Sequence, residues 1–358
     1  MKEQSNMKTV GKQSIKYSNP PFIIAASSVT GQKEGEGPLG KCFDVVSEDP
    51  MFGAKTWEEA ESNMIKQAIE LVIKKANLSK DDIRYIVGGD LLGQLIASSF
   101  GVETLNIPMF GVYGACSTMG ESMALASILV EGGYAPKVLA FTSSHFAGAE
   151  KQFRFPLAYG NQKPLSMTWT VTGSGSVIIA SGLEENKKLG SRNEGMGDEG
   201  LDVVITGITP GKIVDYGIKD SMNMGAAMAP AAVETISQNL TDFGLQPDYY
   251  DRIITGDLGS VGKEILVDLL KEKGYDISAN HMDCGVEIFD PETQDTHSGG
   301  SGCGCSAVTL TGYVLPKMRK GEWKRVLFVP TGALLSTVSF NEGNPVPGIA
   351  HGIMLEAR

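Results

Sequence analysis

The sequence contains no long apolar run, and this absence sets a first limit on the kind of protein it encodes. A transmembrane helix needs about 18 or more consecutive apolar residues, and no stretch of the chain reaches this length. Residues 1–17 are polar and have no apolar core of the kind found in secretory signals. We therefore expect a soluble chain without a signal peptide.

Cysteine and positive charge are also scarce. The five cysteines are scattered along 358 residues, and an odd number so spread does not indicate a disulfide framework, so reduced thiols are expected. The formal net charge is −11 and no basic run stands out, which argues against nucleic-acid binding. There is no Walker-type phosphate loop, and Gly-Ser-Gly at residues 173–175 is too weak a pattern to indicate a dinucleotide. No cofactor is predicted.

A small-residue turn with a cysteine is the most informative stretch of the chain. Residues 113–122 read Tyr-Gly-Ala-Cys-Ser-Thr-Met-Gly-Glu-Ser, after an apolar run and before apolar residues at helical spacing. The pattern predicts a sharp turn that places Cys116 at the first turn of a buried helix. Amides near Ser117 at such a helix end stabilise a thiolate or a bound anion. Cys116 is then either an activated nucleophile or a small buried side chain.

Regular elements are expected on both sides of this turn. A chain of 358 residues is too long for an average single domain, so two domains or a fused double unit are expected. Thr56, with Glu59 three residues later, predicts the start of a long helix. Residues 31–40 are expected to form a loop, and residues 184–200 a solvated linker. Strands are predicted at residues 22–27 and 138–142, after a connection within residues 78–91, and after a turn within residues 173–180.

The second half of the chain repeats the first. Residues 245–258 follow the order of residues 78–91: leucine, an acidic connection, arginine, two apolar residues, a small residue and Gly-Asp-Leu. A second small-residue turn at residues 299–306 takes the place of the Cys116 turn. Such duplication predicts two similar α/β halves packed face to face, residues 1–185 and 186–358, with a shared site between the two turns.

The duplication and the two turns resemble the thiolase superfamily, especially ketoacyl synthase III-like enzymes, over residues 22–355. This resemblance implies a layered αβαβα fold of two similar halves, and commonly a two-fold dimer joined through the edge of the first-half sheet. It also implies a cysteine nucleophile assisted by His-Asn or His-His partners from the second half. Cys116 takes the nucleophile position, whereas the partner positions fall near Thr255 and Ser301. Neither offers an imidazole, although His297 could substitute by a shift of register.

A closer resemblance is carried by Gly-Lys-Gln-Ser at 11–14, Thr-Ser-Ser-His-Phe at 142–146 and Thr-Gly-Asp-Leu-Gly at 255–259. These segments are similar to a family of stage V sporulation proteins implicated in binding and moving dipicolinic acid (pyridine-2,6-dicarboxylate). The resemblance implies dipicolinic acid as the ligand, free or as its calcium chelate. It also implies uptake during sporulation, release during germination, and other subunits of the stage V sporulation A membrane assembly as partners at the spore inner membrane.

The residues themselves support a small anion site rather than acyl-transfer chemistry. Helix-end amides near Ser117, the hydroxyls of Thr255 and Ser301 and a protonatable His297 would serve it. His145 closes a strand at an edge where sites are often built. The predicted ligand site therefore comprises Cys116, Ser117, His145, Thr255, His297 and Ser301.

Two other functions stay open at this stage. An acyltransferase acylated on Cys116 from a coenzyme A or carrier-protein thioester is the alternative enzyme, and a scaffold with an empty cleft is the third class. Cys303 and Cys305 near His297 could suggest a metal, but no further ligand pair has suitable spacing. Packing of small residues accounts better for these two cysteines, so no metal is predicted.

Overall fold

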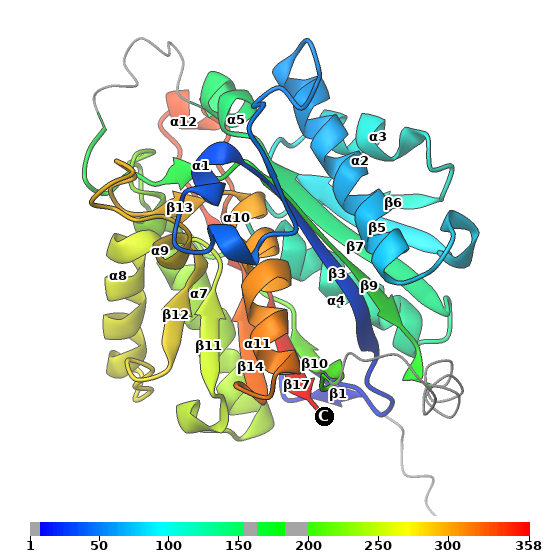
Figure 1. Ribbon diagram of the computed structural model, residues 1–358. Helices are drawn as coiled ribbons and strands as arrows, with labels where there is room; N and C mark the ends of the chain where they lie inside the picture. Colours follow the sequence, from blue (N-terminus) through cyan, green and yellow to red (C-terminus); the bar gives the residue numbers. More distant parts are fainter. Residues whose placement is uncertain (1–7, 154–162, 183–199) are drawn as a thin grey trace, which may run out of the picture.

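A computed structural model describes residues 8–153, 163–182 and 200–358 (Figure 1). Within these ranges, no helix combines the length and the apolar character needed to cross a membrane. The predicted boundary between residues 185 and 186 lies outside the described residues, as does nearly all of the predicted linker at residues 184–200.

The strands of the first half form one side of a large mixed sheet. In spatial order they are β3 (Phe22–Gly31), β9 (Gly173–Ala180), β7 (Lys137–Ser144), β5 (Tyr85–Asp90) and β6 (Met109–Gly111). The first two neighbouring pairs are antiparallel and the last two are parallel. The short β4 (Val45–Ser47) runs parallel to β3. Helices cover both faces, which explains why these strands read as continuous apolar runs.

The second half repeats this arrangement strand for strand. Its order is β10 (Val203–Thr209), β17 (Gly352–Ala357), β14 (Arg325–Val329), β11 (Arg252–Thr255) and β12 (His281–Asp283). Again the first two pairs are antiparallel and the last two parallel. The duplication predicted from the sequence is therefore confirmed.

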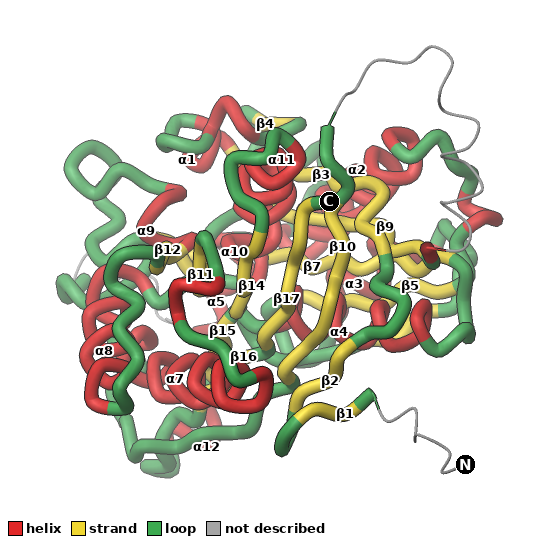
Figure 2. The backbone as a smooth tube through the Cα atoms, turned by 90° about the horizontal axis from the view of Figure 1, so that it is seen from below, coloured by secondary structure: helices red, strands yellow, loops and turns green. Residues whose placement is uncertain are grey.

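The two half-sheets meet at a short junction. β10 pairs antiparallel with β3 at Val204 and Phe22. Figure 2 shows β10 beside β17, with the N-terminal hairpin next to them. The remaining strands are β1 (Thr9–Val10) and β2 (Ser14–Lys16) of that hairpin, the pair β8 (Trp169–Thr170) and β13 (Gly300–Ser301), and the pair β15 (Thr331–Ala333) and β16 (Gly348–Ala350).

Helices complete five layers around the two half-sheets (Figure 1). The first half is covered outside by α2 (Trp57–Lys75) and α3 (Ile96–Glu103), and the second by α7 (Met224–Phe243) and α8 (Gly259–Glu272). Between the halves lie α4 (Thr118–Glu131) and a continuous helical run of α10 (Cys303–Thr309), η5 (Leu310–Val314) and α11 (Leu315–Arg319). The shorter helices are α1 (Gln32–Gly35), η1 (Gly40–Cys42), η2 (Lys80–Asp82), α5 (Phe146–Phe153), η4 (Pro247–Tyr249), α9 (Cys284–Ile288) and α12 (Thr337–Asn341).

Three apolar cores hold these layers together. The central core joins residues of both halves, such as Met123 on α4, Val308 on α10 and Phe328 on β14. The outer cores lie under α2 and α3 and under α7 and α8. The layering is therefore αβαβα, as predicted, and the inner helices bring the two small-residue turns together.

Local predictions hold at the start of α2 and fail at residues 31–40. The hydroxyl of Thr56 accepts the Glu59 N–H at 3.2 Å, so the predicted cap is confirmed. The expected loop instead contains the two short helices α1 and η1. They form because this connection packs against the rest of the first half. The buried Glu34 carboxylate accepts the Thr172 N–H at 2.9 Å.

Candidate functional site

The cysteine turn is a tight, strained connection immediately before α4. Ala115 has a φ of +48°, in the left-handed region that residues with a Cβ rarely adopt. The Ser117 and Thr118 amides donate to the carbonyls of Gly114 and Ala115, each at 3.1 Å. The backbone therefore holds the thiol of Cys116 at a fixed place, between the two halves.

These same hydrogen bonds occupy the amides that the sequence suggested for an anion. The Ser117 hydroxyl also turns inward and donates to the Gly114 carbonyl at 2.7 Å, and the whole residue is buried. Because the chain folds back at Ala115, the amides of Ser117 and Thr118 meet carbonyls of their own turn. A ligand beside Cys116 must therefore use donors other than these two amides.

The second half closes tightly over this turn. A Cβ added at Gly332 would lie 2.1 Å from the Gly114 carbonyl oxygen and 3.2 Å from the Cys116 nitrogen. Only glycine permits this approach of two backbones. The small residues of β15 are thus needed for the contact between the halves.

A carboxyl group, and not an imidazole, lies beside the thiol. Asp257 follows β11 in the second half and is fully buried. Its Oδ2 accepts the Gly302 N–H at 3.1 Å, and its Oδ1 has no hydrogen-bond partner among the described residues. Burial, and then the neighbouring Asp257 carboxyl, raise the pKa of the Cys116 thiol well above its usual value. Burial raises the pKa of Asp257 in the same way. Burial thus favours the neutral form of both the thiol and the carboxyl group.

The hydroxyl of Thr255 serves a different contact. It donates to Oδ2 of Asp283 at 2.6 Å and lies 2.9 Å from Nε2 of His281. Asp283 also accepts the amides of Leu258 and Gly259 at the start of α8. Thr255 therefore belongs to a buried network that fixes α8 against β12, and it does not line the space beside Cys116.

A small cavity of about 60 Å³ opens beside Cys116 and receives walls from both halves. It is smaller than typical ligand pockets of about 300–1,000 Å³. Three of its wall residues, Met222, Met224 and Met228, are unbranched and can rearrange around a ligand. No lysine, arginine or histidine of the described residues lines it. The polar residues of its wall are Tyr113, Cys116, Glu150, Thr170, Ser221 and Ser301.

Of the six predicted site residues, the structure brings Cys116 and Ser301 together at this cavity and leaves the two histidines elsewhere. The His145 ring lies beside Phe52 and Trp57, and its Nε2 is 2.8 Å from the Pro50 carbonyl. Burial lowers the pKa of His145. His145 therefore belongs to a packed cluster behind the strand end.

His297 also finds partners away from the thiol. Its Nδ1 lies 2.9 Å from the Pro164 carbonyl and its Nε2 lies 3.1 Å from Oδ1 of Asp295. The residue is half-buried and does not line the cavity. His297 thus does not supply the imidazole that Cys116 lacks.

Two cationic side chains gather on the other side of β8. Thr170 faces the cavity, and its strand neighbour Trp169 points to the opposite side. Phe146 stacks on the indole of Trp169 with ring centroids 4.0 Å apart. The ammonium groups of Lys33 and Lys163 lie 4.4 and 4.2 Å from the centroid of the Trp169 ring.

Sequence reasoning missed both Asp257 and this lysine pair. The repeated Gly-Asp-Leu could have located Asp257, because its first-half counterpart ends a strand at the same edge of the fold. No pattern in the sequence indicates the lysine pair, because Lys33, Lys163 and Trp169 come from three separate segments.

Solved structures place this architecture in a class. The chain is similar to 3-oxoacyl-[acyl-carrier-protein] synthase III from Aquifex aeolicus VF5, with a TM-score of 0.53 and 14% identity over 94% of this chain and 99% of the other. It is also similar to human mitochondrial 3-ketoacyl-CoA thiolase in complex with CoA, with a TM-score of 0.55 and 11% identity over 95% and 98% of the two chains. The protein has a thiolase-like fold.

Sequence comparison is more specific. The family described as Stage V sporulation protein AD (SpoVAD) matches residues 11–356. The Stage V sporulation protein AD of Bacillus subtilis (strain 168) is 44% identical over 350 residues, which cover 98% of each chain. The chain belongs to the stage V sporulation protein AD family.

Proposed function

We propose that this sporulation protein is a non-catalytic member of the thiolase-like class that binds dipicolinic acid. In this proposal it takes part in dipicolinate uptake during sporulation and its release during germination. The observation that carries the proposal is the pairing of Cys116 with Asp257, where an enzyme of this class would place an imidazole.

This pairing is unsuited to acyl transfer. The nucleophile is the thiolate, and a neighbouring base or cation must lower the thiol pKa to produce it near neutral pH. Here burial and the adjacent carboxyl group raise that pKa. Loss of one stabilising group typically costs about a hundredfold or more in rate. Cys116 is therefore suited to lining a cavity and not to attacking a thioester.

The cavity beside Cys116 suits a flat ring better than a free dianion. Its apolar wall can pack against a pyridine ring, and Ser301 offers a hydroxyl to a carboxylate, whereas the Thr170 hydroxyl donates to Glu150 at 3.4 Å. Its lining supplies no positive charge among the described residues. Lys33 and Lys163 lie on the other side of β8, so they do not neutralise a ligand in this cavity. A calcium chelate would carry its own counter-charge.

Calorimetric titration of the parent and its variants with dipicolinate, with and without calcium, tests both the identity of the ligand and the location of its binding site. Cys116→Trp fills the cavity and should abolish binding, whereas Cys116→Ala should keep most of the affinity. Cys42→Trp, at an exposed cysteine away from the cavity, is the matched control and should bind like the parent. Lys33→Gln, on the other side of β8, should also bind like the parent. Parent-like binding by Cys116→Trp would show that the ligand lies elsewhere.

A second measurement separates this function from acyl transfer. The parent is incubated with acyl-coenzyme A and analysed by mass spectrometry. We expect no stable adduct on Cys116. An acyl group on Cys116 that is absent from Cys116→Ala would favour the enzyme, and absence of both dipicolinate binding and acylation would favour an empty scaffold.

We further propose a place at the spore inner membrane, with the other subunits of the stage V sporulation A assembly as partners. Because the side chain at position 116 is buried, Cys116→Trp leaves the protein's outer surface unchanged. Sporulating cells that carry this variant should keep the protein in the membrane fraction yet make spores poor in dipicolinate. Loss of the protein from that fraction would mean that the variant disturbs assembly.

We also propose a homodimer through β6, which ends the sheet of the first half. Phe110 on β6 is 50% exposed and Phe100 on the adjacent α3 is 63% exposed, although both are large and apolar. Light scattering should give a dimer mass for the parent and a monomer mass for Phe110→Asp. Val338→Asp, at an exposed apolar residue of the second half, should remain dimeric. A concentration-independent monomer mass for the parent would exclude this assembly.

A further inference from the structure

A larger cavity lies on the outer face of the first half, apart from Cys116. Its volume is about 560 Å³, within the range of small-molecule sites. The C-terminal half of α2, the connection after it and the end of α3 form its walls. Because α2 and α4 cover opposite faces of the first-half sheet (Figure 1), this cavity is separate from the one beside Cys116.

The walls of this cavity carry an excess of positive charge. Lys66, Lys74 and Lys80 line it, and Glu70 is the single acidic residue of the described lining. Within the described ranges, none of the three lysines forms an ion pair, although Glu70 lies four positions after Lys66. Unneutralised ammonium groups on a chain of net charge −11 mark a local site for anions.

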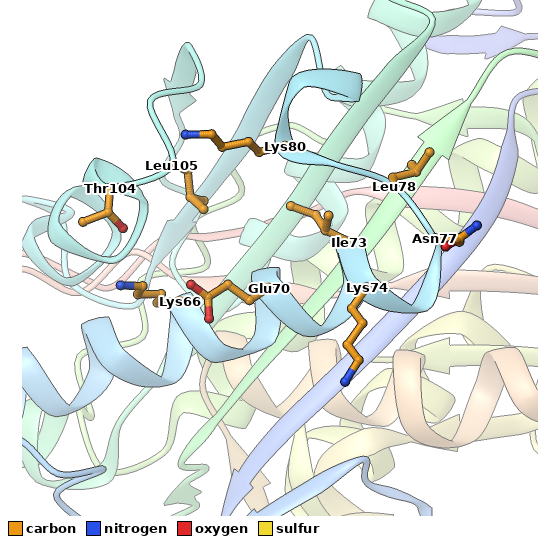
Figure 3. A pocket seen from close by; sticks show the side chains of 9 residues that line it. All are labelled: Lys66, Glu70, Ile73, Lys74, Asn77, Leu78, Lys80, Thr104 and Leu105. Atoms are coloured by element: carbon orange, nitrogen blue, oxygen red, sulfur yellow. The ribbon is translucent and has the colours of Figure 1, made fainter.

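Two of the lysines converge and the third does not (Figure 3). Lys66 and Lys80 extend toward the same side of the cavity, on either side of Thr104, whereas Lys74 extends the other way. The side chains of Ile73 and Leu105 form an apolar floor, with 8% and 7% of their surface exposed. One end of the cavity thus combines two ammonium groups with a hydroxyl and the Glu70 carboxylate beside Lys66, and the remainder can contact apolar atoms.

We propose that this cavity binds a ligand that carries a phosphate group. A phosphate presents several acceptor oxygens in different directions, so Lys66, Lys80 and Thr104 can each meet one of them, and lysine serves well as a point charge for phosphate. The apolar floor receives the organic part of the ligand. The phosphate belongs either to a soluble phosphate ester or to the headgroup of a phospholipid, and these two sources share the same recognition chemistry.

Binding measurements on matched variants test this site. The probes are glycerol 3-phosphate, followed by calorimetry, and vesicles of phosphatidylglycerol in phosphatidylcholine, followed by co-sedimentation at low salt. Lys66→Gln with Lys80→Gln removes the converging pair. Lys41→Gln with Lys55→Gln removes the same total charge from two exposed lysines that do not line the cavity. Thermal unfolding of both double variants checks that they fold.

We expect the parent to bind at least one probe, and the Lys66 and Lys80 variant to bind it about tenfold or more weakly. The control variant should bind like the parent. Binding of glycerol 3-phosphate alone identifies a soluble ligand, and binding of the vesicles alone identifies a headgroup. The proposal is overturned if the parent binds neither probe, or if both double variants lose binding equally.

Discussion

Asp90 and Asp257 stand at the same place in the two halves, yet their surroundings differ. Each belongs to a Gly-Asp-Leu at the end of the corresponding parallel strand, β5 or β11. Asp90 accepts the Ser98 amide at 2.9 Å, the Ser98 hydroxyl at 2.6 Å and the Leu92 amide at 3.0 Å. All three donors come from its own half. Asp257 accepts one amide, from Gly302, and lies beside Cys116 of the other half.

The comparison shows that the two copies of the repeated motif have different structural roles. In the first half, the hydrogen bonds that the Asp90 carboxyl group accepts all serve local structure, because they fix the connection that leads into α3. It also has a buried acidic neighbour: burial and then Asp90 raise the pKa of Glu61, whose Oε1 accepts the Ser143 hydroxyl at 2.8 Å. In the second half the same residue is left with an unpaired oxygen at the contact between the halves. A repeated motif thus became structural in one copy and part of the candidate site in the other.

The largest expected effect is on the free energy of unfolding, and it comes from removing the carboxyl group of Asp90 or of Asp257. Asp90→Ala leaves two buried donors of Ser98 and the half-buried Leu92 amide without an acceptor, and each loss of a buried hydrogen-bond partner costs about 1–3 kcal/mol. We expect it to lower the free energy of unfolding by about 3 kcal/mol or more. Asp257→Ala leaves one amide unpaired and should cost about 1–2 kcal/mol. Urea denaturation followed by circular dichroism measures both, and a greater loss in Asp257→Ala would reverse this reading of the two sites.

The buried acid pair of the first half should also make stability depend on pH. The folded chain holds the proton of Glu61 to higher pH than the unfolded chain does, because its pKa is raised. The folded state therefore binds more protons above the ordinary glutamate pKa, near 4.3, and stability falls as pH rises from there to the raised pKa. Glu61→Gln should flatten this slope, which is at most about 1.4 kcal/mol per pH unit for one group.

Thermal or urea unfolding between pH 4 and 9 measures the slope. The control is Glu70→Gln, which removes one exposed carboxylate from the same helix and is not among the groups that raise the pKa of Glu61. It should keep the slope of the parent. An unchanged slope in Glu61→Gln would show that this carboxyl group does not stay protonated in the folded chain.

The smallest expected effect concerns the thiol. Cys116 should react slowly with iodoacetamide near pH 7, whereas the exposed Cys42 reacts as an ordinary thiol and serves as an internal control. Asp257→Asn removes the charge that raises the thiol pKa at alkaline pH, so alkylation of Cys116 at pH 9 should rise about two- to tenfold. Burial, the larger cause, remains. Asp90→Asn should change nothing at Cys116, and fast modification of the parent below pH 7 would reveal a base that the structure does not show.

Much of the fold could be predicted because its signals are local or repeated. The Thr56 cap, the apolar strands and the order shared by residues 78–91 and 245–258 each lie within short windows. The candidate site is harder to predict from the sequence than the fold. Cys116 was found because its turn is a contiguous motif, and Ser301 because it lies in the matching turn. The free amides expected near Ser117 were not found, since the left-handed Ala115 folds the chain back onto them.

Residue patterns along the chain predict two similar α/β halves and the cysteine turn, because these depend on periodicity and turn chemistry. The αβαβα layering and the two partner positions without an imidazole follow from the resemblance to the thiolase superfamily. Only the tertiary structure decided that Asp257 faces Cys116, that Thr255 turns to Asp283, and that Lys33 and Lys163 meet over Trp169. The physical reason is that each of these contacts joins separate segments, and their side-chain directions are set by how the layers pack.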